Sequence, residues 1–72
     1  MSQFIEDIAD KLARDAIKAA EEHDSDKIID EVANILGATS STTQEHFLTF
    51  VRVHRASKRA TEYLAGLKKP KG

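Results

Sequence analysis

Residues 41–67, STTQEHFLTFVRVHRASKRATEYLAGL, decide the fold because they form the longest stretch of the chain that favours a single helix. The stretch has no proline, and its one glycine is next to last. The hydroxyls of Ser41 and Thr42 each stand three residues before a Gln or Glu, which is the capping-box spacing at a helix start. We therefore predict a long helix over residues 43–67.

This long helix is expected to have two distinct faces. On a wheel at about 100° per residue, one side is apolar and carries Phe50, Val53, Ala56, Ser57, Ala60, Tyr63, Leu64 and Leu67, with Phe47 at its edge. The other side carries a basic arc, which consists of Arg52, Arg55, Lys58 and Arg59. The helix begins with apolar residues on almost every side, so this end is expected to pack between two other elements.

Two shorter helices are predicted before the long one. Residues 3–22 have apolar side chains three and four positions apart, as in an amphipathic helix. Alanine is frequent on that apolar face, and small side chains let a neighbouring helix approach closely. The pattern is interrupted near Asp24 and Ser25, either of which is suited to cap a second helix. That second helix is expected over residues 26–36, with Gly37 directly after its end.

The predicted fold class is all-α, a small three-helix domain with two shorter amphipathic helices and one long C-terminal helix. Residues 1–67 form the single domain, and residues 68–72 form a flexible basic tail. The chain has 72 residues, and a domain this small buries only about 60% of its unfolded surface. The helices therefore either form a bundle within one chain or stay open and are completed by dimerisation.

Acidic and basic residues are divided between the two halves of the chain. Residues 1–36 hold ten acidic and four basic residues, and residues 37–72 hold two acidic and seven basic residues. The net charge of −1 thus combines −6 in the first half with +5 in the second. Such halves attract each other within or between subunits, or leave the basic half for an anionic partner.

Composition and motifs argue against several other functions. The chain has no cysteine, which excludes disulfides and thiolate metal sites. His46 and His54 do not share a helix face as a metal-binding pair would, so no metal site is expected. No nucleophile stands in a recognisable catalytic frame, and glycines are few, so we expect no enzyme, cofactor or small-molecule substrate. No apolar run is long enough to cross a membrane, and the cytoplasm is the expected location.

The predicted function is that of a non-enzymatic helical interaction module, an adaptor or regulator that binds a protein partner and self-associates. The partner-binding residues are expected at the apolar start of the long helix and along the basic arc: Phe47, Leu48, Phe50, Val51, Arg52, Arg55, Lys58 and Arg59. The alternative is a small nucleic-acid-binding protein whose basic arc neutralises phosphates. Against this alternative, no aromatic residue stands among the arginines to stack on bases.

Overall fold

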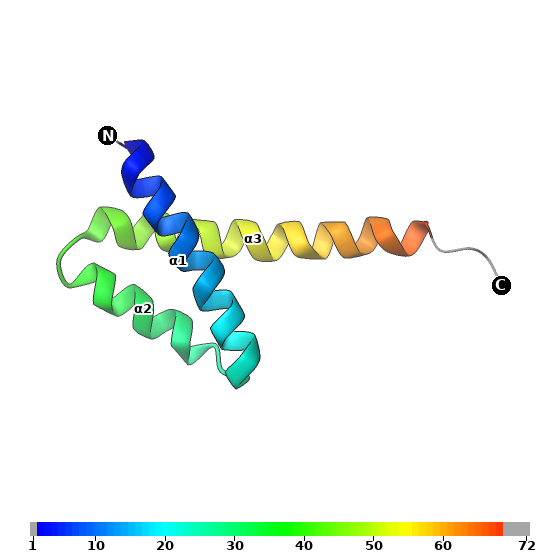
Figure 1. The fold of residues 1–72 in the computed structure, drawn as a ribbon, viewed down its shortest axis with the longest axis horizontal. Coiled ribbons are helices and arrows are strands. Elements are labelled where there is room, and N and C mark those ends of the chain that lie inside the picture. Colours follow the sequence, from blue (N-terminus) through cyan, green and yellow to red (C-terminus); the bar gives the residue numbers. More distant parts are fainter. Residues whose placement is uncertain (1, 69–72) are drawn as a thin grey trace.

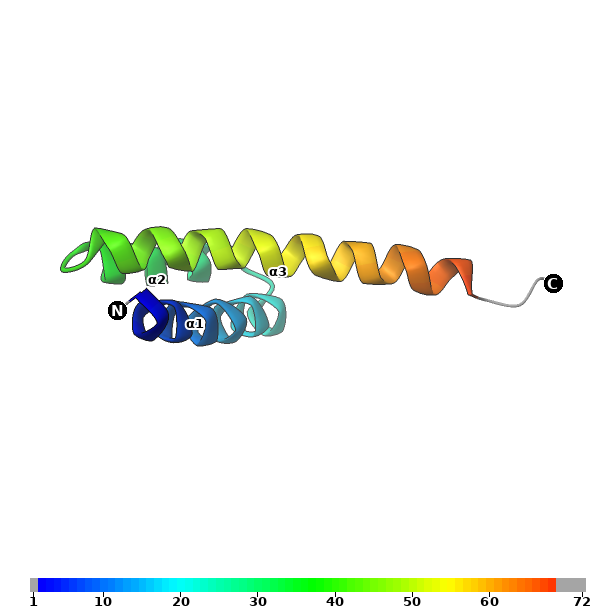
Figure 2. The same ribbon diagram turned by 90° about the horizontal axis from the view of Figure 1, so that it is seen from above.

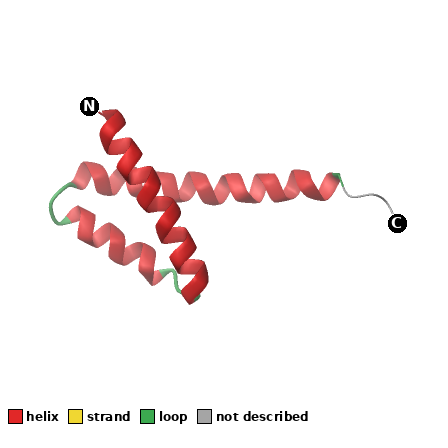
Figure 3. Ribbon diagram, viewed as in Figure 1, coloured by secondary structure: helices red, strands yellow, loops and turns green. Residues whose placement is uncertain are grey.

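The computed structural model of the chain describes residues 2–68. Three helices follow each other: α1 (Ser2–His23), α2 (Lys27–Gly37) and α3 (Ser41–Leu67) (Figure 1). They hold nearly all of the described residues, among which there is no strand (Figure 3). The predicted small all-α domain is therefore confirmed, whereas its completion by dimerisation stays a prediction. Of the predicted basic tail, only Lys68 lies within the described residues, as the C-cap of α3.

α2 and α3 form an antiparallel hairpin, and α1 crosses this hairpin on one side (Figures 1 and 2). Each of the three helices contacts the other two. The arrangement is flat, with extents of 54 × 29 × 13 Å, because the helices form only two layers. None of the described helices covers the other face of the hairpin (Figure 2).

Four alanines form the contact face of α1. Ala9, Ala13, Ala16 and Ala20 are four, three and four residues apart, so they line one side of the helix. Each of them is at most 5% exposed. Side chains this small allow the axis of α1 to approach the hairpin closely. The expectation that the alanine-rich face of the first helix packs against its neighbours is confirmed.

The rest of the core comes from α2 and from the first turns of α3. Ile29 and Ala33 on α2 are buried together with Phe47 and Val51 on α3. Phe47 is the largest side chain that is fully buried. Both α1 and α2 pack against this end of α3 (Figure 1). The prediction that the start of the long helix packs between two other elements is therefore confirmed.

The turn between α1 and α2 reverses the chain at Asp24. The φ of Asp24 is 51°, in the left-handed region that Asp tolerates better than most residues. Ser25 N donates a hydrogen bond to Ala20 O at 2.9 Å and holds the turn against the end of α1. The predicted interruption is confirmed, but the predicted cap is wrong. Asp26 is the N-cap of α2, and its side chain makes no capping bond because it bonds Arg55 on α3 instead.

The end of α2 is held by Gln44 from the first turn of α3. Gln44 Nε2 donates a hydrogen bond to Ala33 O at 2.9 Å. A Cβ atom on Gly37 would collide with that same nitrogen. Gly37, which was expected just after the second helix, is the last residue of α2. Its lack of a side chain leaves room for Gln44.

The N-cap of α3 lies one residue before the predicted capping boxes. Ser40, rather than Ser41 or Thr42, is the capping residue, and its Oγ accepts a hydrogen bond from Thr43 N at 3.2 Å. Gln44, which was expected to complete a capping box, bonds α2 instead. A bond to a neighbouring helix thus replaces a local one.

Beyond residue 55, α3 leaves the rest of the molecule. Every residue from Ala56 to Lys68 is exposed, and Figure 1 shows these turns projecting as a single helix. We call residues 56–67 the arm. The body consists of α1, α2 and residues 41–55.

Candidate interaction surface

Two residues of the basic arc pair with the acidic part of the body. Arg55 donates from Nη2 to Asp26 Oδ1 at 2.9 Å and from Nη1 to Asp26 Oδ2 at 3.4 Å. Lys58 Nζ donates to Glu21 Oε2 at 3.1 Å. The attraction predicted between the two halves of the chain is therefore realised within one subunit at these two pairs.

A further polar contact joins α3 to the middle of α1. His54 Nε2 lies 2.5 Å from Asp10 Oδ1, and both side chains are half-buried. Asp10 also forms an ion pair with Arg14 on its own helix, with 3.3 Å between Oδ2 and Nη2. His54 follows Phe47 and Val51 on the same side of α3. The core-facing side of α3 therefore changes from apolar to polar at this point, and the apolar core ends here.

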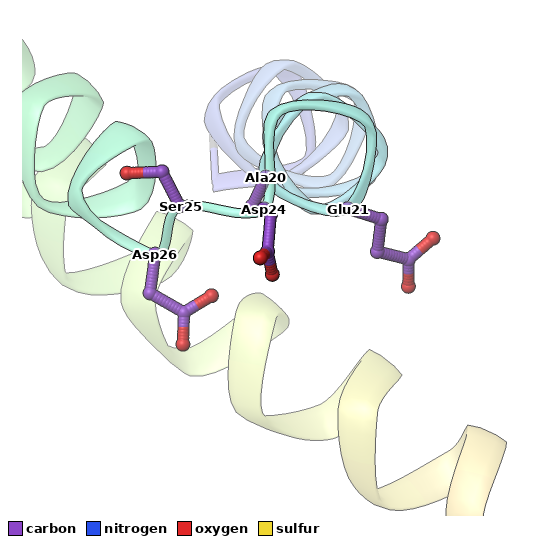
Figure 4. A pocket seen from close by; sticks show the side chains of 5 residues that line it. All are labelled: Ala20, Glu21, Asp24, Ser25 and Asp26. Atoms are coloured by element: carbon purple, nitrogen blue, oxygen red, sulfur yellow. The ribbon is translucent and has the colours of Figure 1, made fainter.

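A shallow hollow lies at the turn between α1 and α2. It is lined by Ala20, Glu21, Asp24, Ser25 and Asp26 (Figure 4). The three carboxylates point to one side of the turn, toward α3, and the Ser25 hydroxyl points away from them (Figure 4). The hydrogen bonds and the positive charge of Arg55 hold the pKa of the Asp26 carboxyl below its usual value of 3.8. The hollow is thus the acidic half of the junction between the turn and α3.

The apolar residues predicted to bind a partner lie mainly inside the body. Phe47 and Val51 belong to the core, and Leu48 and Phe50 are half-buried against it. The ring of Phe50 stacks on His46, with ring centroids 6.2 Å apart. These four residues therefore use much of their apolar surface within the subunit, and their predicted role at a partner interface stays a prediction.

The remaining two cations of the basic arc are open to solvent. Arg52 and Arg59 are both exposed, and among residues 2–68 neither has an acidic group within ion-pair distance. The basic arc is therefore divided. Arg55 and Lys58 pair with acidic residues of the body, whereas Arg59 lines a hollow beside Glu21 and Asp26 without an ion pair within residues 2–68, and Arg52 is open to solvent.

Exposed apolar side chains follow the arm, beginning with Val53, three residues before it. Val53 is 52% exposed, Tyr63 67%, Leu64 56% and Leu67 66%. Together with Ala56 and Ala60, which are also exposed, they form a continuous line that we call the outer stripe. Contiguous exposed apolar surface is a feature that is typical of protein–protein contact sites.

The outer stripe faces away from the body. At about 100° per residue, its mean direction lies on the opposite side of α3 from Phe47 and Val51. A shift of α1 or α2 along α3 would therefore not cover it. The apolar side of the long helix that the sequence pattern singles out is thus the exposed side, except for Phe50 at its start.

The residues of the outer stripe were predicted as the apolar side of the long helix, but not as partner-binding residues. The available signal was their spacing. Val53, Ala56, Ala60, Tyr63 and Leu67 are separated by three, four, three and four residues, which is the heptad spacing of paired helices. Phe47 and Val51 fall outside that spacing, so the buried and the exposed apolar residues of α3 belong to two different faces.

Other classes of site have no counterpart in the described residues. Within residues 2–68, no three His, Asp or Glu side chains lie close enough together to hold a metal ion. None of the three described helices combines the length and the hydropathy needed to cross a membrane. Among the exposed large apolar side chains of residues 2–68, the four of the outer stripe lie on one helix, whereas Phe4 and Ile8 lie on α1 and Ile35 lies on α2.

Comparison of the chain with protein-family models, with curated proteins and with solved structures gives no match.

Proposed function

We propose that this chain is a non-enzymatic helical interaction module that binds a protein partner through the outer stripe of its arm. The observation that carries the proposal is the orientation of the stripe, since its large apolar side chains are more than half exposed and point away from the body. Its role is that of an adaptor or regulator that self-associates. The cytoplasmic location expected from the sequence is part of this proposal.

The physical state of the arm supports a binding role. An isolated helix of roughly a dozen residues is marginally stable in water. Every residue of the arm is exposed, and within residues 2–68 its side-chain bond to the body is the Lys58–Glu21 pair at its base. Burial of apolar surface contributes about 25 cal/mol per Å², so a partner that covers the stripe would stabilise both the arm and the complex.

The division of the basic arc favours a protein partner over nucleic acid. Phosphate binding requires several cations free to face one backbone, whereas Arg55 and Lys58 are bonded to Asp26 and Glu21. Of the four cations of the basic arc, Arg52 and Arg59 are the two that have no acidic group within ion-pair distance among residues 2–68. The aromatic residue of the arm, Tyr63, lies on the outer stripe rather than within the arc.

The test compares the binding of two charged variants to cell extract of the source organism. Ala60→Lys places a cation in the middle of the outer stripe, and Ala65→Lys makes the same change on another side of the arm. Both alanines are exposed, and lysine is a good helix former, so neither change disturbs the fold. We expect cross-linking and mass spectrometry to identify a protein, including this chain itself, that is retained by the wild type and by A65K and lost by A60K.

Two outcomes would contradict the proposal. One is that A60K and A65K retain the same proteins as the wild type. The other is binding of the purified chain to generic duplex DNA that falls steeply with salt and is lost on charge reversal of Arg52 and Arg59, since that would show phosphate contacts.

A further inference from the structure

We infer that the occupant of the outer stripe is the outer stripe of a second copy of this chain, with the two arms packed antiparallel. The inference rests on the proposed function, because it names the partner of the same surface. Its basis is the order of small and large side chains along the stripe and the distribution of charge around it.

The side chains of the stripe complement each other when two arms run in opposite directions. In the register that sets Ala60 against Tyr63 of the second copy, Ala56 faces Leu67 of the second copy. Tyr63 and Leu67 then each meet an alanine of the second copy, and the twofold axis repeats both contacts. Alternation of small and large residues across facing positions is the condition for close packing of two helices.

A parallel pair of arms would lack this complementarity. Equivalent positions would face each other, so Ala60 would meet Ala60 and Tyr63 would meet Tyr63. The alanine layers would then leave gaps, and the tyrosine layer would hold the helices apart.

Charge also favours the antiparallel pair. Residues 1–40 hold ten acidic and four basic residues, so their net charge is −6. Antiparallel arms place the two acidic bodies at opposite ends of the dimer, and each cationic arm points toward the acidic body of the other copy. Parallel arms would bring the two bodies side by side, where they repel each other.

Arg59 selects one antiparallel register. Arg59 and Gly66 both lie beside the stripe, on the same edge of it. In the register described above, Arg59 of one copy is the neighbour of Gly66 of the second copy, which is in the last turn of α3. The free carbonyl groups at a helix C-terminus favour a cation, and a Cβ at Gly66 would have no heavy atom within 4 Å, so the site is open. A shift by one heptad would set Arg59 against Arg59 of the second copy.

The first experiment measures the mass of the purified full chain by light scattering at concentrations from about 1 µM to 1 mM. The stripe is short, about 21 Å from Val53 to Leu67 at 1.5 Å per residue, so we expect a weak dimer with a concentration-dependent mass. The mass should rise from 8.0 kDa toward twice that value. Ala60→Lys should raise the dissociation constant by about a hundredfold or more, because it buries a cation against the second copy. Ala65→Lys, the matched control, should behave as the wild type.

The second experiment determines the direction of the arms. The chain has no cysteine, so the single-cysteine variants A56C and L67C can be mixed and oxidised. Antiparallel arms place position 56 of one copy beside position 67 of the other, within reach of a disulfide. We expect the mixed product, A56C linked to L67C, to exceed each symmetric product by clearly more than the twofold excess that random pairing would give.

Three results would overturn the inference. They are a wild-type mass of 8.0 kDa at every concentration, a dimer that A60K leaves unchanged, and a predominance of the symmetric cross-linked products. The first of these is distinguishable from failure of the proposed function. A monomeric chain that still loses a cellular protein on Ala60→Lys would retain the interaction module and exclude only the second copy as its partner.

Discussion

The two halves of α3 belong to one uninterrupted helix, but their large apolar side chains lie on opposite sides of it. In the first half, Phe47 and Val51 face α1 and α2 and are buried. In the arm, Tyr63 and Leu67 lie on the other side and are exposed. An amphipathic helix that packs against one core has its apolar residues on one side along its whole length. This change of side is why we propose that α3 serves two different contacts, one within the subunit and one outside it.

The body and the arm also differ in how strongly a substitution in each should change the free energy of unfolding. The buried core consists of eight residues, of which five are alanines, so its apolar surface is small and its stability depends on close packing. The arm has no packed neighbours to disturb. Matched substitutions in the two regions should therefore have very different effects on folding.

Aromatic truncation should give the largest difference between the regions. Phe47→Ala removes a fully buried ring and should lower the free energy of unfolding by about 3–5 kcal/mol, enough to unfold much of the population. Tyr63→Ala removes a ring that is 67% exposed, and its effect should stay within about 0.5 kcal/mol. The measurement is urea denaturation followed by circular dichroism at the lowest workable concentration. Equal losses from the two variants would show that the arm is packed in the free chain.

Replacing an alanine by leucine should give the second largest difference in stability between the body and the arm. Ala13 is fully buried on the contact face of α1, so Ala13→Leu should force α1 from the hairpin and cost about 1–3 kcal/mol. Ala65→Leu on the arm meets only solvent and should change the unfolding free energy by less than about 0.5 kcal/mol. Thermal melts of both variants test this. An Ala13→Leu variant as stable as the wild type would mean that α1 does not depend on small side chains.

The body was largely predictable from the sequence because local patterns determine it. Helical spacing placed all three helices to within a few residues, and the alanine face of α1 indicated close packing correctly. The caps were less predictable. Asp26 and Gln44 are suited to local capping, but each bonds another helix, and such long-range bonds leave no mark in the spacing of a sequence.

The division of α3 was not predictable from a helical wheel. A wheel combines all residues of a helix into one projection, so the stripe from Val53 to Leu67 outweighs Phe47 and Val51. Those two residues are the ones that pack within the subunit. The ion pairs of Arg55 and Lys58 were not predictable from the sequence pattern either, because their partners Asp26 and Glu21 lie 29 and 37 residues away in the sequence. Only the arrangement of the helices shows which cations are paired within the chain.

Replacement of the two glycines by alanine should give a smaller difference in stability between the body and the arm. Gly37→Ala in the body would displace the Gln44 side chain and break its bond to Ala33 O, a loss of about 0.5–1.5 kcal/mol that the better helix propensity of alanine partly offsets. Gly66→Ala in the arm meets no atom within 4 Å and should favour the helix by up to about 1 kcal/mol. We expect a lower melting temperature for the first variant and greater far-ultraviolet helicity for the second. A more stable Gly37→Ala chain would remove the role assigned to Gln44.

The smallest effect concerns the ion pair that fastens the base of the arm to the body. Arg55 lowers the pKa of Asp26 in the folded state below 3.8. A carboxyl group whose pKa is lowered by folding stabilises the fold above its unfolded pKa, and this contribution is lost as the pH falls through the folded value. Asp26→Asn should therefore lower the melting temperature by a few degrees at most at pH 7, and the difference from the wild type should vanish in strong acid.

Asp15→Asn is the matched control for that ion pair. Lys11 also lowers the pKa of Asp15, so both variants lose their effect over the same acidic range, but Lys11 and Asp15 lie on one helix. Only Asp26→Asn should increase hydrogen exchange of the backbone amides near Arg55, because only that pair joins two helices. If exchange near Arg55 rises equally in both variants, or in neither, the Asp26 pair does not fix the direction in which the arm leaves the body.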